Sequence, residues 1–292
     1  MVVYSVLTTD RDTQYVRVYC TYNPSGNDPL TNHDEIPVTD ANVTISSDSA
    51  LYQFQKTVVQ RVDKSRYASD IVAYMSSPFR LARGKTYRLT VTSPTLGTAT
   101  ATTTVPGAAS ISAINFIALA DPYYARVQGY GLDVILSPQA KAFLTRIYVD
   151  YLASTPQGWQ LKRRQIPVVM KPLSRYMGTW DFIYPVVKRR GVGPSETQGF
   201  TTGGWINMLE NVIWLYDGAG VTFQQAVFYL IQFDEALYNY YGVANISRDK
   251  YSVRIDEPDF SNIQGGVGVF GSSGVDSIAY ALPETITRPP PK

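Results

Sequence analysis

The stretch that decides the fold lies near the C-terminus and reads Asn262-Ile263-Gln264-Gly265-Gly266-Val267-Gly268-Val269-Phe270-Gly271. Its glycines are interleaved with β-branched and aromatic residues, which is typical of a strand whose backbone passes close to other segments. A phosphate-binding loop is the competing interpretation, but the run lacks the Walker lysine and no βαβ pattern surrounds it. We therefore expect a tightly packed strand of a β-rich domain that performs no chemistry itself.

Composition also predicts a mainly β protein. Hydrophobic residues make up 45% of the 292 residues and charged residues only 17%, against about 25% charged in an average globular protein. The 22 tyrosines and 11 phenylalanines suit pleated, half-buried surfaces. The formal net charge of +2 is too small to indicate nucleic-acid binding. The length is sufficient for two domains.

The first third of the chain alternates apolar and polar residues in short runs separated by polar turns. In the first such run, Val16, Val18 and Cys20 fall on one face, so we expect Cys20 to be buried. The number and spacing of these runs predict an immunoglobulin-like or transthyretin-like antiparallel β-sandwich over residues 1–106. The strands predicted there span residues 15–20, 38–45, 84–92 and 98–105.

A domain boundary is predicted at Pro106-Gly107-Ala108-Ala109-Ser110. Beyond it we expect a larger β-rich domain over residues 110–284, with one or two short helices, and a solvated tail over 285–292. One helix is predicted from the one-face spacing of Trp205, Met208, Leu209, Val212 and Ile213, and a second from Asp234 as its N-cap, with Leu237 and Tyr241 on one face. The strands predicted in this domain span residues 111–118, 126–136, 143–151 and 221–233.

Two basic triplets, Lys162-Arg163-Arg164 and Lys188-Arg189-Arg190, flank an aromatic segment broken by prolines. If they meet in the fold, they form a cationic patch suited to an anionic glycan, a lipid headgroup or the acidic face of a protein partner. The alternative is that these arginines are solvated on loops. The candidate patch consists of Arg163, Arg164, Tyr176, Trp180, Tyr184, Lys188, Arg189 and Arg190.

Residue types that perform catalysis or bind metals are scarce. A catalytic triad would have to use the only histidine, His33, and nothing in the sequence places it beside Cys20 or a serine. One histidine and one cysteine also argue against zinc and against an intrachain disulfide. Calcium is an alternative in the polar loop, but the order of its acidic and amide residues does not match an EF-hand. Those residues are Asn27, Asp28, Asn32, Asp34 and Glu35.

Paired carboxylates for glycoside hydrolysis are the remaining enzymatic alternative. Asp256, Glu257 and Asp259 lie together, but Pro258 among them indicates an exposed turn. We therefore expect a protein that is not an enzyme, with no catalytic, cofactor or metal site.

Several motifs together resemble a known family. Tyr238-Asn239-Tyr240 matches a Tyr-x-Tyr element, and the C-terminal run supplies Asn262, Gly266, Gly268 and Phe270 of an Asn-Ile-x-x-Gly-x-Gly-x-Phe pattern. Residues 37–45 and 84–89 are similar to Pro-Val-x-x-Ala-x-Val and Gly-x-x-Tyr-x-Leu elements, and Asp121-Pro122-Tyr123-Tyr124 is loosely similar to a further one. On these motifs the chain resembles domain-of-unknown-function family 4249, exported lipoproteins of Bacteroidota and relatives.

The resemblance implies a periplasmic or cell-surface protein, often encoded near TonB-dependent receptors, and it carries over no catalytic residues. No apolar run approaches the roughly 18 residues that span a bilayer, so we expect membrane attachment only through an N-terminal lipid anchor on a removed export segment. The expected function is binding of an envelope partner, such as an outer-membrane receptor, or of a glycan. The alternatives are a structural subunit of an extracellular assembly or filament and a carbohydrate-active enzyme that uses Asp256 and Glu257.

Overall fold

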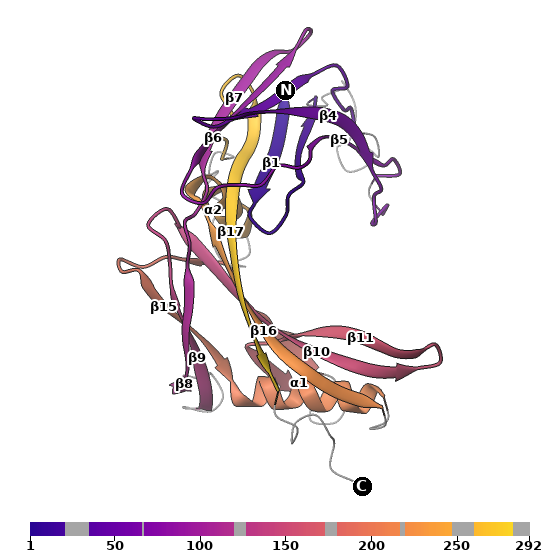
Figure 1. Ribbon diagram of the computed structural model, residues 1–292, viewed down its shortest axis with the longest axis vertical. Helices are drawn as coiled ribbons and strands as arrows, with labels where there is room; N and C mark the ends of the chain where they lie inside the picture. Colours follow the sequence, from indigo (N-terminus) through magenta and orange to yellow (C-terminus); the bar gives the residue numbers. More distant parts are fainter. Residues whose placement is uncertain are drawn as a thin grey trace. The chain divides into compact units, whose positions relative to one another are not determined.

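The computed structural model describes residues 1–20, 35–65, 67–119, 127–172, 180–216, 220–246 and 260–282. Within these ranges the protein is mainly β, as predicted, with strands β1 to β17 and helices α1 and α2 (Figure 1). The chain divides into two compact units, which we describe separately. The first comprises Met1–Ala108, Pro138–Ala142 and Gln232–Gly274, and the second comprises Ala109–Ser137, Phe143–Ile231 and Val275–Lys292.

The units are not consecutive stretches of the sequence, in contrast to the predicted domains 1–106 and 110–284. The division at Ala108 lies within the predicted boundary, but Gln232–Gly274 belong to the first unit. The reason is a parallel pairing of β1 (Val2–Thr8) with β17 (Val267–Ala281), whose register runs from Val2↔Val267 to Thr8↔Ser273. Figure 1 shows the indigo β1 beside the yellow β17. The N-terminal segment therefore does not complete its own sheet.

The strands of the first unit follow the order β17-β1-β2-β5-β4-β3-β6-β7. Strand β4 (Leu51–Val59) pairs with β3 through residues 51–54 and with β5 through residues 55–59, so it passes from one group of strands to the other. Every pairing in this order other than β1–β17 is antiparallel. The remaining bounds are β2 Gln14–Tyr19, β3 Asn42–Ser46, β5 Ile71–Ser76, β6 Thr86–Ser93 and β7 Gly97–Thr104.

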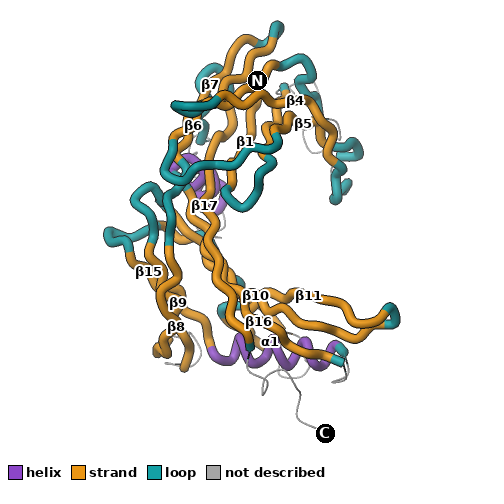
Figure 2. The backbone as a smooth tube through the Cα atoms, in the orientation of Figure 1, coloured by secondary structure: helices purple, strands orange, loops and turns teal. Residues whose placement is uncertain are grey.

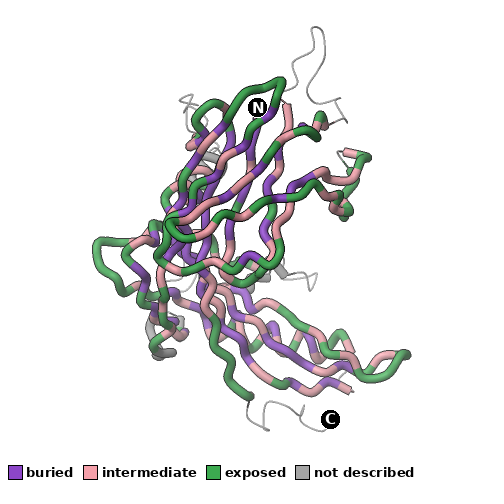
Figure 3. Tube along the Cα trace, turned by 45° about the horizontal axis from the view of Figure 1, so that its top comes forward, coloured by how far each residue is buried: buried purple, intermediate pink, exposed green. Residues whose placement is uncertain are grey.

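The core of the first unit joins both groups of strands, as expected of a sandwich. Within the core the ring of Phe79 stacks on that of Tyr52, with ring centroids 3.8 Å apart. Strand β6 lies within the predicted span 84–92, and its alternate residues Tyr87, Leu89 and Val91 are all buried. Cys20 is half-buried rather than buried, because it follows the last residue of β2 and packs at the margin of the core. Figure 3 shows the alternation of buried and exposed residues along these strands.

The C-terminal glycine run leads into β17 and is buried from Gly268 to Gly271, and its backbone packs closely on other segments, as expected. Gly268 has φ +121°, and a Cβ on it would overlap the carbonyl oxygen of Val3 in β1. At Gly266 a Cβ would lie 2.8 Å from the carbonyl oxygen of Met1. Only glycine lets the two parallel strands approach in this way.

Helix α2 (Glu235–Ile246) begins where the sequence predicted it. Oδ1 of Asp234 accepts a hydrogen bond of 2.8 Å from the backbone N–H of Leu237, which is the contact of an N-cap residue. Leu237 is buried, and Tyr241 on the same face is 41% exposed. In the part of the chain that the structure describes, neither α1 nor α2 is long and apolar enough to cross a membrane.

The second unit contains the strands predicted between residues 111 and 151. Strands β8 (Ser110–Leu119), β9 (Val127–Ile135) and β15 (Ser195–Thr201) form an antiparallel sheet in the order β15-β9-β8. Strands β12 (Val169–Pro172) and β13 (Trp180–Ile183) pair with each other. Helix α1 (Thr202–Leu215) confirms the predicted spacing, since Met208 and Val212 are buried, and the Thr201 hydroxyl caps it by accepting from the backbone N–H of Gly204.

A long hairpin dominates the remainder of the second unit (Figure 2). Strand β10 (Ala142–Thr155) pairs antiparallel with β11 (Gly158–Ile166), in a register from Ile147↔Ile166 to Thr155↔Gly158. On its other side β10 neighbours β16 (Val221–Phe233), whose bounds are those predicted. The two-residue strand β14 (Lys188–Arg189) also pairs with β10.

Candidate functional site

A groove in the first unit, which we call the tyrosine groove, is the candidate site. It lies between β1, β2 and helix α2 and has a volume of about 500 Å³, within the range typical of ligand pockets. Five of its residues are tyrosines. Its lining consists of Tyr4, Ser5, Val6, Thr8, Arg11, Thr13, Gln14, Tyr15, Arg17, Tyr19, Leu237, Tyr240, Tyr241 and Val269.

Strand alternation builds one wall of the groove. In β2 the core takes Val16 and Val18, so the intervening residues Tyr15, Arg17 and Tyr19 project from the opposite face. Tyr15 is 38% exposed and therefore presents its ring to solvent. A strand with this pattern supplies a row of large side chains on a rigid backbone.

Helix α2 builds the opposite wall. Its first turn is fixed by the Asp234 cap, and Leu237 packs so closely on β17 that a Cβ added at Gly271 would lie 2.9 Å from the Leu237 Cβ. This packing brings Tyr240 and Tyr241 into the groove lining. The glycine at position 271 is thus required for the helix to sit against the strand.

The tyrosines contact one another across the groove. Tyr4 stacks on Tyr19 with ring centroids 5.8 Å apart and meets Tyr240 edge-on at 5.7 Å. Tyr240 in turn meets Tyr241 edge-on at 5.7 Å. Burial raises the pKa of Tyr19, and the neighbouring Tyr4 raises it further, so its phenol keeps its proton at neutral pH. The rings therefore form a neutral, rigid, amphipathic surface.

Two polar residues of the lining are engaged in holding the β1–β2 connection. The Gln14 amide donates to the carbonyl oxygens of Thr8 (3.0 Å) and Arg11 (2.9 Å) and accepts from the backbone N–H of Thr8 (3.1 Å). The Ser5 hydroxyl donates to the carbonyl oxygen of Tyr15 at 2.9 Å. These groups stabilise the groove, which leaves tyrosine rings and arginine side chains as its recognition elements.

Arg17 is positioned by an ion pair and an aromatic ring. Its Nη2 donates to Oε1 of Glu35 at 2.9 Å, and its guanidinium lies 5.5 Å from the centroid of the Tyr19 ring. The other oxygen of Glu35 accepts from Arg61 at 2.6 Å. Glu35, an expected member of the polar-loop cluster, is thus a structural ion-pair partner.

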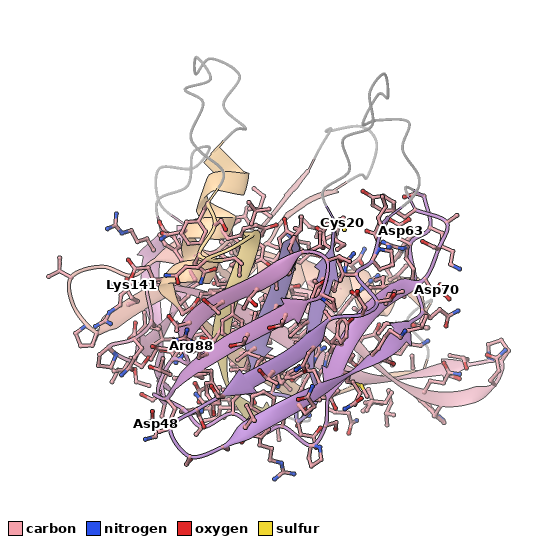
Figure 4. All side chains as sticks on the ribbon, turned by 90° about the horizontal axis from the view of Figure 1, so that it is seen from above. Cys20, Asp48, Asp63, Asp70, Arg88 and Lys141 are labelled. Carbon is pink, nitrogen blue, oxygen red and sulfur yellow. The ribbon has the colours of Figure 1, made fainter. Side chains whose placement is uncertain are left out.

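Two further hollows continue the groove along β2. One, of about 720 Å³, shares Arg11, Thr13 and Tyr15 with the tyrosine groove. The other, of about 130 Å³, shares Arg17 and Tyr19 and extends to Asp70. Figure 4 shows Asp70 and Asp63 at one side of the first unit, and a hydrogen bond from the backbone N–H of Arg61 lowers the pKa of Asp70. The three hollows therefore lie next to one another, because each of the two further hollows shares lining residues of β2 with the tyrosine groove.

The tyrosine groove presents mainly aromatic rings, hydroxyl groups and two guanidinium groups. Its described lining residues include no carboxylate, imidazole or thiol. In the described ranges no three His, Cys, Asp or Glu side chains gather as metal ligands. Tyrosine and arginine are the residue types enriched at binding interfaces.

Only some cations of the candidate basic patch are exposed, because others bind groups within the chain. Arg163 belongs to a structural cluster: it donates to both oxygens of Asp150, at 2.5 and 2.8 Å, and to the Tyr229 hydroxyl at 3.0 Å. Its guanidinium also lies 5.6 Å from the Tyr148 ring centroid. Asp150 is buried, and the Arg163 hydrogen bonds lower its pKa. Arg163 therefore stabilises the hairpin.

The other patch residues are distributed along the second unit. Arg190 donates to the carbonyl oxygen of Ser137 at 2.8 Å, so it too has a structural contact. Tyr184 stacks on Phe182 with centroids 6.4 Å apart. Trp180 begins β13, whereas Tyr176 lies outside the described residues. Arg164, Lys188 and Arg189 are exposed.

The two basic triplets lie along one edge of β10. Strand β16 flanks the other edge. At one end of β16 the Lys141 N–H donates to the carbonyl oxygen of Phe233, and at the other end the Ser154 N–H donates to that of Gly220. Strand β11 stops pairing at Ile147, so β14 must occupy the same edge beyond that residue. The triplets are thus consecutive in space along β10.

Other sequence-based candidates lie outside the described residues. These are His33 with Asn27, Asp28, Asn32 and Asp34, the segment Asp121-Pro122-Tyr123-Tyr124, the carboxylates Asp256, Glu257 and Asp259, and the tail 285–292.

Sequence reasoning missed the tyrosine groove, although two signals pointed to it. Residues 15–20 were correctly predicted as a strand, and the face opposite the core carries Tyr15, Arg17 and Tyr19. The Tyr238-Asn239-Tyr240 element was noted only as a family motif. What joins them is the packing of α2 on β17, which neither pattern specifies.

A family model described as Domain of unknown function (DUF4249) matches residues 1–152, just over half of the 292 residues. No curated protein matches the sequence. The matched region contains β1 to β9 and most of β10, whereas the C-terminal motif that carried much of the resemblance lies beyond it. The match includes the β1–β2 wall of the tyrosine groove. On this match, the chain belongs to the DUF4249 family.

Proposed function

We propose that this protein is a non-catalytic binding protein of the cell envelope that recognises a protein partner through the tyrosine groove. The observation that carries the proposal is the convergence of five tyrosines and two arginines on a groove of about 500 Å³. Tyrosine supplies a large, rigid contact area at a small cost in conformational entropy, and arginine adds charged hydrogen bonds.

The arrangement of the three hollows favours an extended segment of the partner. Their shared lining residues include Tyr15, Arg17 and Tyr19 of β2, whose six residues span roughly 20 Å at about 3.3 Å per residue. The polar groups of the floor are engaged within the chain, which suits the apolar and aromatic side chains of a peptide better than the many hydroxyls of a glycan.

The proposal includes a location in the periplasm, in the outer membrane or at the cell surface, with attachment to the membrane through an N-terminal lipid anchor. Membership of the DUF4249 family supports this location through the resemblance to exported lipoproteins. An outer-membrane receptor of the TonB-dependent class is the partner we propose to look for first.

Site-specific photo-crosslinking in intact envelopes tests the proposal. A photoreactive phenylalanine analogue replaces Tyr15 or Tyr241, which are 38% and 41% exposed. The matched control carries it at Leu51, which is 69% exposed and lies outside the groove. We expect both groove positions to give the same discrete protein adduct and Leu51 to give none. Absence of a protein adduct, or an identical adduct from Leu51, contradicts the proposal.

A structural subunit joined through sheet edges is the second candidate, and an open strand edge favours it. The edge of β7 is occupied, because Thr100 forms an antiparallel bridge with Gln264. The outer edge of β11 carries no strand among the described residues. Sedimentation over a wide range of concentrations distinguishes this candidate, which requires self-association.

A further inference from the structure

The open edge of β11 has an unusual side-chain pattern. One face carries Trp159 and Leu161, which are 59% and 68% exposed. The opposite face carries Lys162 and Arg164, half-buried and exposed respectively. The charge of Arg163 is not available to an incoming strand, because Asp150 already neutralises it. An incoming strand would therefore meet apolar side chains on one face and cations on the other.

The β11 strand of a second copy is a poor occupant of that edge, so a structural assembly would have to pair β11 with a different strand of the next copy. Antiparallel pairing of β11 with its own copy over the full strand would centre on Lys162, the middle of Gly158–Ile166. Lys162 would then face Lys162, with the arginines of both copies close by. Like charges directly opposite each other destabilise a strand pair, and lysine on an edge strand is a common protection against self-association.

We propose that the outer edge of β11 binds an extended acidic segment of a partner protein by strand addition. Main-chain hydrogen bonds to β11 would supply affinity, as in other cases of β-augmentation. Specificity would come from alternation: acidic residues opposite Lys162 and Arg164, and apolar residues beside Trp159 and Leu161. This surface lies in the second unit and is independent of the tyrosine groove.

Strand β14 adds further positive charge beside β11, which is complementary to an acidic segment. Lys188 and Arg189 of β14 are exposed and lie along the same edge of β10 as β11. A segment that continues past β11 would therefore meet further cations. The edge thus favours a partner whose acidic residues recur at every second position over a length greater than β11 itself.

Fluorescence anisotropy with synthetic peptides tests the proposal on the full chain. The probe is a labelled peptide of nine residues, the length of β11, that alternates glutamate with valine or threonine. Its control is an isomer of the same composition with the glutamates in one block. We expect the alternating peptide to bind and the block isomer to bind at least about tenfold more weakly, because only alternation matches both faces.

Protein variants separate strand addition from general charge attraction. Lys162→Glu combined with Arg164→Glu should weaken binding of the alternating peptide by about tenfold or more. The matched control, Lys56→Glu with Arg88→Glu, reverses two exposed cations of the first unit and should leave binding unchanged. Circular dichroism of each variant verifies folding.

Three results would overturn the proposal: equal binding of the two peptide isomers, equal effects of the two double variants, or binding of anionic phosphatidylglycerol vesicles without binding of the peptide. The last result would assign these cations to a lipid surface instead.

Discussion

The side-chain amide of Asn262 hydrogen-bonds both backbone groups of Phe270: Nδ2 donates to the Phe270 carbonyl oxygen at 2.8 Å, and Oδ1 accepts from its N–H at 2.9 Å. Asn262 thereby acts as a one-residue strand partner for β17 at a buried position. Only a primary amide has a donor and an acceptor in this arrangement. This pairing gives Asn262 a structural role in the C-terminal motif, since it holds the backbone of β17 at Phe270.

Replacing Asn262 by alanine should lower the free energy of unfolding by about 2 kcal/mol, because both backbone groups of Phe270 lose their partner. Denaturant unfolding measures the change. Gln264→Ala is the control, since the Gln264 side chain is exposed and only its backbone bonds Thr100. Similar losses for both variants would show that the amide pairing is not responsible.

Gly268→Ala should be among the most destabilising single substitutions in the first unit. The new Cβ would overlap the carbonyl oxygen of Val3 and would also face a φ of +121°. Gly97→Ala has a φ of +79° and open space around it, so it reports the backbone strain alone. We expect Gly268→Ala to lower the free energy of unfolding by about 2 kcal/mol more than Gly97→Ala, which is the cost of overpacking. Thermal unfolding of both variants tests this difference.

Arg163→Ala should destabilise the β10–β11 hairpin by about 2 kcal/mol, less than a fully buried pair because the Arg163 side chain is 43% exposed. The neighbouring Arg164→Ala should have little effect. The Asp150 pKa is lowered in the folded protein, so the contribution of the pair is present above about pH 4, the ordinary pKa of aspartate, and is lost as the pH falls further. Urea unfolding at neutral pH and near pH 3 measures both effects, and a constant difference between wild type and Arg163→Ala would contradict them.

Asp234 should give the opposite pH dependence. Burial raises its pKa, although hydrogen bonds from Thr103, the Leu237 N–H and Ser272 act in the other direction. The folded state therefore holds a proton that the unfolded state releases, and stability falls as the pH rises from about 4 towards the folded pKa. Asp234→Asn keeps an N-cap acceptor and cannot ionise. We expect wild type to lose stability relative to Asp234→Asn between pH 4 and 7, and parallel curves would refute this.

Much of the fold was predictable because strand alternation is a local signal. The span of β16 and the helix cap at Asp234 were both identified correctly, since residue period and capping chemistry depend on neighbours within a few positions. The parallel pairing of β1 with β17 was not predicted, because it joins segments at opposite ends of the chain. The same long-range pairing joins Gln232–Gly274 to the first unit, which therefore contains more than the predicted segment 1–106.

The candidate site was harder to predict from the sequence than the fold. The basic triplets were recognised from composition, yet the buried carboxylate that neutralises Arg163 lies 13 positions away, on the facing strand. The tyrosine groove needed the joint placement of β2 and α2, and more than 200 residues of sequence separate them. No spacing rule links two such segments.

The sequence by itself determined the mainly β class, the approximate spans of about half of the strands, the positions of the two helices and the face of β2 that carries Val16 and Val18 to the core, because these follow from backbone periodicity and side-chain chemistry over a few residues. Only the tertiary structure decided that β1 pairs in parallel with β17, that α2 packs its tyrosines opposite Tyr4 and Tyr15, and which cations remain exposed on β11. The partner of each strand depends on burial and hydrogen bonding throughout the core, and local sequence patterns do not specify it.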